Sequence, residues 1–197
     1  MNIRRLIDLK LLAPWALGWY LARALRQASL RLWFKTFGYY GFRKIGRDVR
    51  IDGMPEFIVP CSDIRLGDHV RIGKRCVFQG EIDIVIDIGD NVTINDGAVI
   101  TALYGIEIGS GTSIGEYSSI RDYNHKFDDT SIGIKDQGYV GSPIRIGKNV
   151  WLGRGVCVLA GVIIGDNAVI GANAVVTKSI PEGCTAVGVP AKVIRRR

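Results

Sequence analysis

The side chain best suited to proton transfer in this sequence lies in an unusual setting. The chain has 197 residues and only two His, His69 and His125. His125 lies in the polar stretch 121–143, directly after three residues with hydrogen-bonding side chains: Asp122, Tyr123 and Asn124. A histidine titrates near neutral pH and can accept or donate a proton there. We interpret His125 as a candidate general base, with a solvated loop residue as the alternative.

The other residues with reactive side chains favour structural roles. His69 lies inside a regular repeat, and we expect an outward-facing surface residue. The four cysteines show no CxxC or other paired-ligand spacing, so no zinc site is predicted: Cys61, Cys76, Cys157 and Cys184. A chain of this length can build its own core without disulfides. We expect reduced thiols that act as small apolar fillers in a cytoplasmic protein.

The elements that must position His125 repeat with a period of six. Every sixth residue is aliphatic in one unbroken series: Ile146, Leu152, Val158, Ile164, Ile170 and Val176. A Gly follows most of these positions, and a small or β-branched residue lies four positions after each. Earlier registers contain Leu66, Ile72, Phe78 and Ile84, then Ile88, Ile94, Ile100 and Ile106, then Ile108, Ile114 and Ile120. The register shifts near 84–88 and 106–108.

A period of six fits neither a helix nor a long hairpin strand. It indicates a very short strand followed by a corner, with the aliphatic residue inward and Gly supplying space and backbone freedom. Three such sides form one coil, and coils must stack to bury their apolar faces. We predict an all-β parallel β-helix of six or seven coils over residues 45–180, interrupted by an excursion loop at 121–143. A β-sandwich explains six unbroken matches poorly.

The N-terminal quarter differs from the rest in charge. Residues 1–50 hold 11 Lys and Arg against 2 Asp and Glu, a net charge of +9, whereas the whole chain has +7. Basic residues confined to one end do not suggest a nucleic-acid binder. The longest uncharged run, Leu11–Ala22, has 12 residues, too few to cross a bilayer. We predict that residues 1–42 form a basic, aromatic, amphipathic helical segment on an anionic membrane surface.

Two other interpretations of this segment stay open. It is also compatible with a helical cap that packs on the main domain or on a sister subunit. The segment is also compatible with a signal peptide, because it has a basic start, an apolar run and, at Ala22-Arg23-Ala24, a sequence that resembles a small-residue cleavage site. The basic-aromatic pattern continues past Ala24, which argues against cleavage there.

Motifs in the second half resemble one known family. Pro143-Ile144-Arg145-Ile146-Gly147-Lys148-Asn149-Val150-Trp151-Leu152-Gly153, and later Gly188-Val189-Pro190-Ala191-Lys192-Val193-Ile194-Arg195, are similar to hexapeptide-repeat acetyltransferases. The resemblance covers about residues 65–197, and the N-terminus looks more like the capsular and exopolysaccharide members. It implies a left-handed β-helix over 43–197, a homotrimer, acetyl-CoA as donor and an active site between subunits. We expect no metal, because a three-His zinc site needs more His than this chain has.

The resemblance also implies residue roles. His125 would be the general base that deprotonates an acceptor hydroxyl, and Asp122, Tyr123 and Asn124 would bind the acceptor. The residues implied for coenzyme A are Trp151, Gly153, Arg154, Ala172, Thr177, Lys178, Lys192 and Arg195. Arg154 stands where relatives often have a small residue, and Trp151 is alternatively an outward-facing aromatic. Several residues compete to orient His125: Asp122, Asn124, Glu116, Asp128 and Asp129.

The leading expectation is O-acetylation of a saccharide, lipid-linked or a surface-polysaccharide precursor, at the inner face of the cytoplasmic membrane. One alternative is N-acetylation of an amino sugar or a small acceptor. Another is a catalytically inactive β-helix scaffold, which has no need of His125.

Overall fold

The computed structural model describes residues 18, 21, 22, 25, 29, 42–58 and 63–196. The chain divides into two compact units, Met1–Gly38 and Tyr39–Arg197. In the first unit the described residues are helical and exposed: Gly18, Leu21, Ala22, Leu25 and Ser29. The predicted segment 1–42 also includes Phe42, which is described and begins a strand. The remaining residues of the segment, like Cys61, lie outside the described residues, so that segment stays a prediction. Within the described part of the chain, no helix has the length and hydropathy that a membrane span requires.

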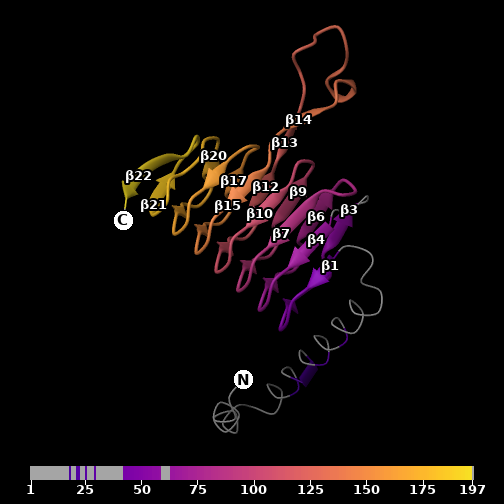
Figure 1. Ribbon diagram of the computed structural model, residues 1–197, viewed down its shortest axis with the longest axis vertical. Coiled ribbons are helices and arrows are strands. Elements are labelled where there is room, and N and C mark those ends of the chain that lie inside the picture. Colours follow the sequence, from indigo (N-terminus) through magenta and orange to yellow (C-terminus); the bar gives the residue numbers. More distant parts are fainter. Residues whose placement is uncertain are drawn as a thin grey trace. The chain divides into compact units, whose positions relative to one another are not determined.

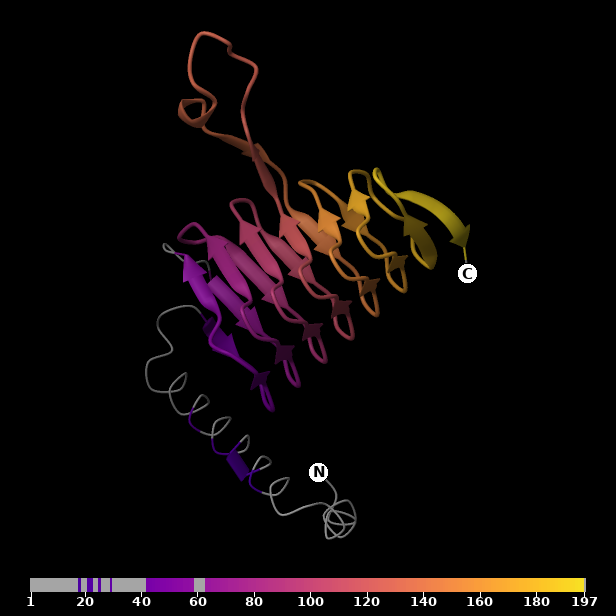
Figure 2. The same cartoon turned by 180° about the vertical axis from the view of Figure 1, so that it is seen from behind.

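The second unit is a parallel β-helix of three sheets. Figure 1 shows its coils stacked one beside the next, and Figure 2 shows the same stack from behind. The first sheet has the order β1 (Phe42–Ile45), β4 (Asp63–Leu66), β7 (Val85–Ile88), β10 (Ile106–Ile108), β15 (Ile144–Ile146) and β18 (Ile163–Ile164).

The other two sheets follow the same coil order. The second contains β2 (Arg50–Ile51), β5 (Arg71–Ile72), β8 (Thr93–Ile94), β11 (Ser113–Ile114), β16 (Trp151–Leu152), β19 (Val169–Ile170), β21 (Cys184–Val187) and β22 (Lys192–Arg196). The third contains β3 (Glu56–Ile58), β6 (Val77–Gly80), β9 (Val99–Ala102), β12 (Ser119–Arg121), β17 (Cys157–Val158) and β20 (Val175–Val176). All neighbours pair in parallel except β21 and β22, which are antiparallel.

Stacked aliphatic side chains fill the interior, as the six-residue period predicts. One column of the first sheet contains Ile64, Ile86, Ile106 and Ile144, each at most 3% exposed. The unbroken series from Ile146 to Val176 is buried throughout. At the N-terminal end, the rings of Phe42, Phe57 and Phe78 contact one another at centroid distances of 5.1–6.0 Å. This aromatic cluster lies at the end of the stack where β1, β2 and β3 are the outermost strands among the described residues.

The length of a coil varies at the corner from the third sheet to the first. That corner takes residues 81–84 after β6, residues 103–105 after β9 and the whole excursion after β12. The sequence register placed Ile84 inward, which is wrong: Ile84 is half-buried in the corner, and Ile86 pairs with Ile64 instead. This coil is four residues longer than one of three hexapeptides, so the inward position that corresponds to Leu66 is Ile88, four residues after Ile84.

Glycine at the corners mainly permits close coil-to-coil approach. A Cβ on Gly109 would lie 2.5 Å from the carbonyl carbon of Gly147 in the next coil, which is too short for a contact between non-bonded atoms. Left-handed backbone is adopted at other corner positions, including non-glycine residues such as His69, Tyr117 and Asn149. His69 is exposed there, as predicted.

Candidate active site

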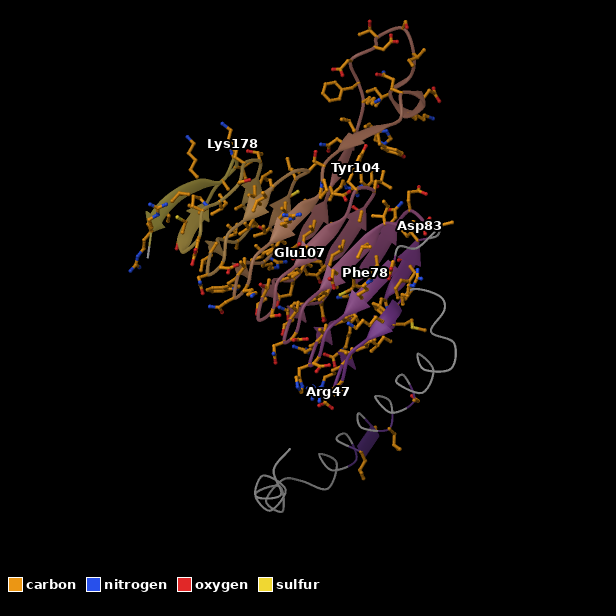
Figure 3. All side chains as sticks on the ribbon, viewed as in Figure 1. Arg47, Phe78, Asp83, Tyr104, Glu107 and Lys178 are labelled. Atoms are coloured by element: carbon orange, nitrogen blue, oxygen red, sulfur yellow. The ribbon has the colours of Figure 1, made fainter. Side chains whose placement is uncertain are left out.

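The polar stretch between β12 and β15 forms a hairpin that projects from the β-helix (Figures 1 and 2). Its arms are β13 (Tyr123–His125) and β14 (Tyr139–Gly141), and a short 3-10 helix, η3 (Ile134–Asp136), lies near its tip. The arms pair antiparallel, with His125 opposite Tyr139. Figure 3 shows Asp83, Tyr104 and Lys178 along the edge of the stack from which the hairpin leaves. The predicted excursion is therefore a structured element.

Asp122 anchors the foot of this hairpin, which is the place where the chain leaves the coil at Asp122 and returns to it at Ser142. Its carboxylate is fully buried and accepts three backbone N–H bonds, from Leu103 at 2.8 Å, Tyr104 at 2.8 Å and Gly105 at 2.7 Å. Burial raises the pKa of the Asp122 carboxyl, and these N–H donors oppose the rise. Because these bonds join β13 to the preceding coil, Asp122 fixes where the hairpin starts.

The second arm returns to the same foot. The backbone N–H of Ser142 donates to the carbonyl oxygen of Asp122 at 3.0 Å. A Cβ on Gly141 would lie 2.1 Å from that oxygen and 2.8 Å from the Tyr104 ring. Only a glycine allows the two arms and Tyr104 to lie this close together.

His125 is exposed on the first arm, at one side of the hairpin. Its ring lies 4.6 Å from the ring of Tyr139, and Tyr139 in turn lies 5.1 Å from the nearly buried ring of Tyr123. Asn124 is also exposed, and it points to the opposite face of the strand because strand side chains alternate. An exposed imidazole on a braced hairpin can reach an external hydroxyl.

None of the carboxylates considered as orienting groups forms an ion pair with His125 in the described part of the chain. Asp122 is occupied by backbone donors. Asp129 accepts bonds from the backbone and hydroxyl of Ser131, which lower the pKa of the Asp129 carboxyl. The ring neighbour of His125 is Tyr139, a residue that the sequence reasoning missed. Its contact depends on the hairpin register, which the six-residue period does not contain.

The residues expected to bind coenzyme A lie on the β-helix itself. Trp151 is 60% exposed on the second sheet, in one row with Val169, Thr185 and Arg195. Since neighbouring strands lie about 4.8 Å apart, the backbones of Trp151 and Arg195 are separated by about 14 Å. Lys192 is exposed on the same last strand.

The remaining donor-site residues occupy two corners. Gly153 is buried beneath Ala172, since a Cβ on Gly153 would lie 2.7 Å from the Ala172 nitrogen. Arg154, beside it, is exposed with its guanidinium 5.4 Å from the Tyr117 ring centroid. Thr177 and Lys178 are exposed after β20, at the edge that also carries the hairpin. Among the described residues, the structure does not bring His125 and Trp151 together, because the second sheet and the hairpin lie on different sides of the coil.

An open cavity adjoins the hairpin, and the described residues contain no cluster of metal ligands. No group of three or more His, Cys, Asp and Glu side chains in these ranges could hold a metal ion. An open cavity of about 250 Å³ on the first sheet is lined by residues that include Gly105, Glu107 and Pro143. It adjoins the foot of the hairpin but contains none of the predicted site residues.

Two families of repeats match this chain. The family described as bacterial transferase hexapeptide (six repeats) matches residues 143–178, and the hexapeptide repeat of succinyl-transferase matches residues 63–102. Together they cover both halves of the β-helix on either side of the hairpin.

Proteins of known description are similar over most of the chain. A protein of Escherichia coli described as "Putative lipopolysaccharide biosynthesis O-acetyl transferase WbbJ" is 35% identical over 82% of this chain and 91% of its own length. A probable acetyltransferase of Mycobacterium tuberculosis is 35% identical over 91% of this chain, which spans 58% of that protein's length. The N-acyltransferase AntD of Bacillus cereus, solved with dTDP and coenzyme A, has 22% identity and a TM-score of 0.69 over 83% of this chain and 88% of its own. At that identity, AntD shows the fold alone.

Proposed function

This chain belongs to the hexapeptide-repeat acyltransferases, and on that basis we propose that it is an acetyl-CoA-dependent O-acetyltransferase of a saccharide hydroxyl. The observation that carries the proposal is the exposed His125 on a braced hairpin, in a chain whose lipopolysaccharide O-acetyl transferase relative aligns over 91% of its own length. The acceptor would be a lipid-linked saccharide or another surface-polysaccharide precursor.

The proposed chemistry is a direct transfer. His125 takes the proton from the acceptor hydroxyl while the oxygen attacks the thioester carbonyl of acetyl-CoA. Backbone N–H groups would stabilise the negative oxygen of the tetrahedral intermediate. The intermediate then collapses, the C–S bond breaks, and the imidazolium returns the proton to the departing thiolate. The products are the acetyl ester and coenzyme A.

No cysteine nucleophile takes part in this scheme. Burial raises the pKa of the Cys76 thiol to about 11. Burial also raises the pKa of the Cys157 thiol. Since a thiolate is the reactive form, both side chains fit the predicted structural role.

For the donor, we propose that Trp151 contacts the pantetheine arm and that Gly153, Arg154, Ala172, Thr177 and Lys178 line the groove. Lys192 and Arg195 would bind the adenosine phosphates, since exposed cations attract them. The row that joins Trp151 to Arg195 supports a donor that extends along the second sheet.

We further propose a homotrimer of left-handed β-helices. Within one chain the second sheet and the hairpin lie on different sides of the coil. A site that needs both His125 and Trp151 would then contain residues of two subunits. The basic segment 1–42 would hold this assembly on an anionic membrane surface, at the inner face of the cytoplasmic membrane.

The experiment that tests the function is an acceptor screen. The purified protein is incubated with acetyl-CoA and a panel of lipid-linked and free saccharides, and thiol release and product mass are followed. The proposal predicts coenzyme A release that depends on acceptor and a product heavier by one acetyl group. Alkali-labile product indicates an ester, whereas alkali-stable product would indicate an amide and so the alternative, N-acetylation. No acceptor-dependent release from any saccharide would favour the scaffold alternative.

A further inference from the structure

The outer face of the third sheet carries one charged side chain between β6 and β20, among the described residues. The other outward positions are uncharged: Val77, Gln79, Val99, Thr101, Ser119, Cys157 and Val175. Arg121, at the end of β12, is the exception. It lies directly before the foot of the hairpin that carries His125.

The guanidinium of Arg121 is held by one aromatic residue. Its Nη1 donates to the Tyr123 hydroxyl at 2.7 Å, and its carbon lies 4.9 Å from the Tyr123 ring centroid. In the part of the chain that the structure describes, no carboxylate lies within ion-pair distance of Arg121, whereas on the first sheet Arg65 pairs with Asp63 at 2.6 Å. A guanidinium has five N–H donors, so the bond to Tyr123 leaves most of them available.

A buried hydroxyl next to Arg121 has no hydrogen-bond partner. Thr101 is 1% exposed, and its Oγ1 is the one buried side-chain polar atom of the described residues without a partner. Thr101 is the register partner of Arg121 in the β9–β12 ladder, so their backbones lie about 4.8 Å apart. A buried hydroxyl without a bond is destabilising, and an anion bound at Arg121 could accept from it.

Ring contacts connect Arg121 to the candidate base. The guanidinium of Arg121 lies over the Tyr123 ring. The Tyr123 ring contacts the Tyr139 ring at a centroid distance of 5.1 Å, and the Tyr139 ring contacts the His125 ring at 4.6 Å. Tyr123, His125 and the guanidinium therefore belong to one continuous surface of the hairpin and its foot. A ligand whose charged group lies at Arg121 extends from there toward His125.

We propose that Arg121 is a specificity-determining residue that binds an anionic group of the acceptor saccharide, a carboxylate or a phosphate, while the reacting hydroxyl lies at His125. This inference rests on the proposed acetyltransferase function. It narrows the acceptor class to saccharides that carry a negative charge, because a neutral saccharide leaves the guanidinium without a charged partner.

The test uses three matched acceptors: a neutral glycoside, the corresponding uronic acid and the corresponding sugar phosphate. We expect the native enzyme to have a higher kcat/KM for at least one charged acceptor. Arg121→Gln lowers kcat/KM for that acceptor about 10- to 100-fold through KM, as the loss of a charge-assisted hydrogen bond requires, and leaves the neutral acceptor unchanged. The acceptor whose kcat/KM falls in Arg121→Gln, the uronic acid or the sugar phosphate, shows whether Arg121 binds a carboxylate or a phosphate.

Two further variants sharpen the result. Arg121→Lys keeps the charge but not the planar fork and should recover part of the preference. Arg65→Gln removes a guanidinium from the first sheet and should change none of the three values. Equal losses of Arg121→Gln on all three acceptors would overturn this inference alone, as would a changed oligomeric state, which would mean that Arg121 pairs with another copy. Absence of acetylation with the native enzyme on every acceptor would overturn the proposed function together with it.

Discussion

His125 and Asp122 come from one tetrapeptide and have different environments. His125 is exposed and contacts Tyr139, whereas Asp122 is fully buried and bonded to three backbone N–H groups. The tetrapeptide thus contains a group that can meet an acceptor and a group that fixes the hairpin. A contact between Asp122 and the acceptor, as the family resemblance implies, stays a prediction, and its three bonds favour a positioning role.

Removing the Asp122 carboxylate should weaken the fold and the activity together. Asp122→Ala leaves three N–H donors without their acceptor, so we expect a loss of about 1–3 kcal/mol in the free energy of unfolding and a lower kcat/KM. Urea unfolding and acetyl-transfer assays measure the two effects. The control is Asp87→Ala, which removes an exposed carboxylate of β7 and should change stability by less than about 0.5 kcal/mol. An Asp122→Ala variant as stable as the native protein would contradict the anchoring role.

At the scale of the elements, the sequence predicted the β-helix because its signal is periodic. Each inward residue from Ile146 to Val176 could be placed by counting six, because each side of every coil places one aliphatic side chain in the same interior. The corner lengths could not be derived this way. Ile84 and Ile86 are both aliphatic, and only the pairing of β4 with β7 decides which of them faces inward.

The contacts within the hairpin, like the corner lengths, could not be derived from the six-residue period. The polar composition of 121–143 predicted an excursion at this place, but the pairing of His125 with Tyr139 crosses a long loop. Contacts between residues so far apart in the sequence follow from the register of two short strands. For the same reason Arg121 and Thr101, which belong to successive coils, gave no signal in the sequence.

The close approach of neighbouring coils predicts a large effect at Gly109. Gly109→Ala would place a Cβ 2.5 Å from backbone carbon of the next coil, so the coils must separate, and we expect a loss of about 1–3 kcal/mol or more. Gly133→Ala is the matched control, because the added Cβ meets only the Asp136 carboxylate at 2.9 Å, and a side chain can move. Urea midpoints compare the two variants. An unchanged midpoint for Gly109→Ala would refute the argument from close approach.

At the scale of the whole molecule, the separation of His125 from Trp151 within one chain predicts complementation between subunits. His125→Ala and Trp151→Ala proteins, each with low activity, are unfolded together in equal amounts and refolded. In a trimer whose sites combine His125 of one subunit with Trp151 of its neighbour, random assembly restores roughly a quarter of the sites. Recovery of activity to that level supports a shared site, and a mixture no more active than its components would speak against it.

The basic N-terminal segment predicts membrane attachment of the whole protein. Deletion of residues 1–40 removes 7 of the 11 Lys and Arg in the first 50 residues, so the shortened protein should no longer float with anionic liposomes. The full chain should float with anionic liposomes and, because the attraction is partly electrostatic, less well at high salt. If the shortened protein still floats, attachment belongs to the β-helix.

The central claim, that His125 is the base of an acetyl transfer, has a direct test in His125→Asn. Loss of a positioned general base should lower kcat about 10²- to 10⁴-fold, while acetyl-CoA binding, followed by calorimetry, stays close to the native value. The matched control is His69→Asn, since His69 is the other histidine, lies at a corner in left-handed backbone (φ 58°), and asparagine tolerates that conformation. We predict full turnover for His69→Asn and almost none for His125→Asn. Equal turnover of the two variants would contradict the account.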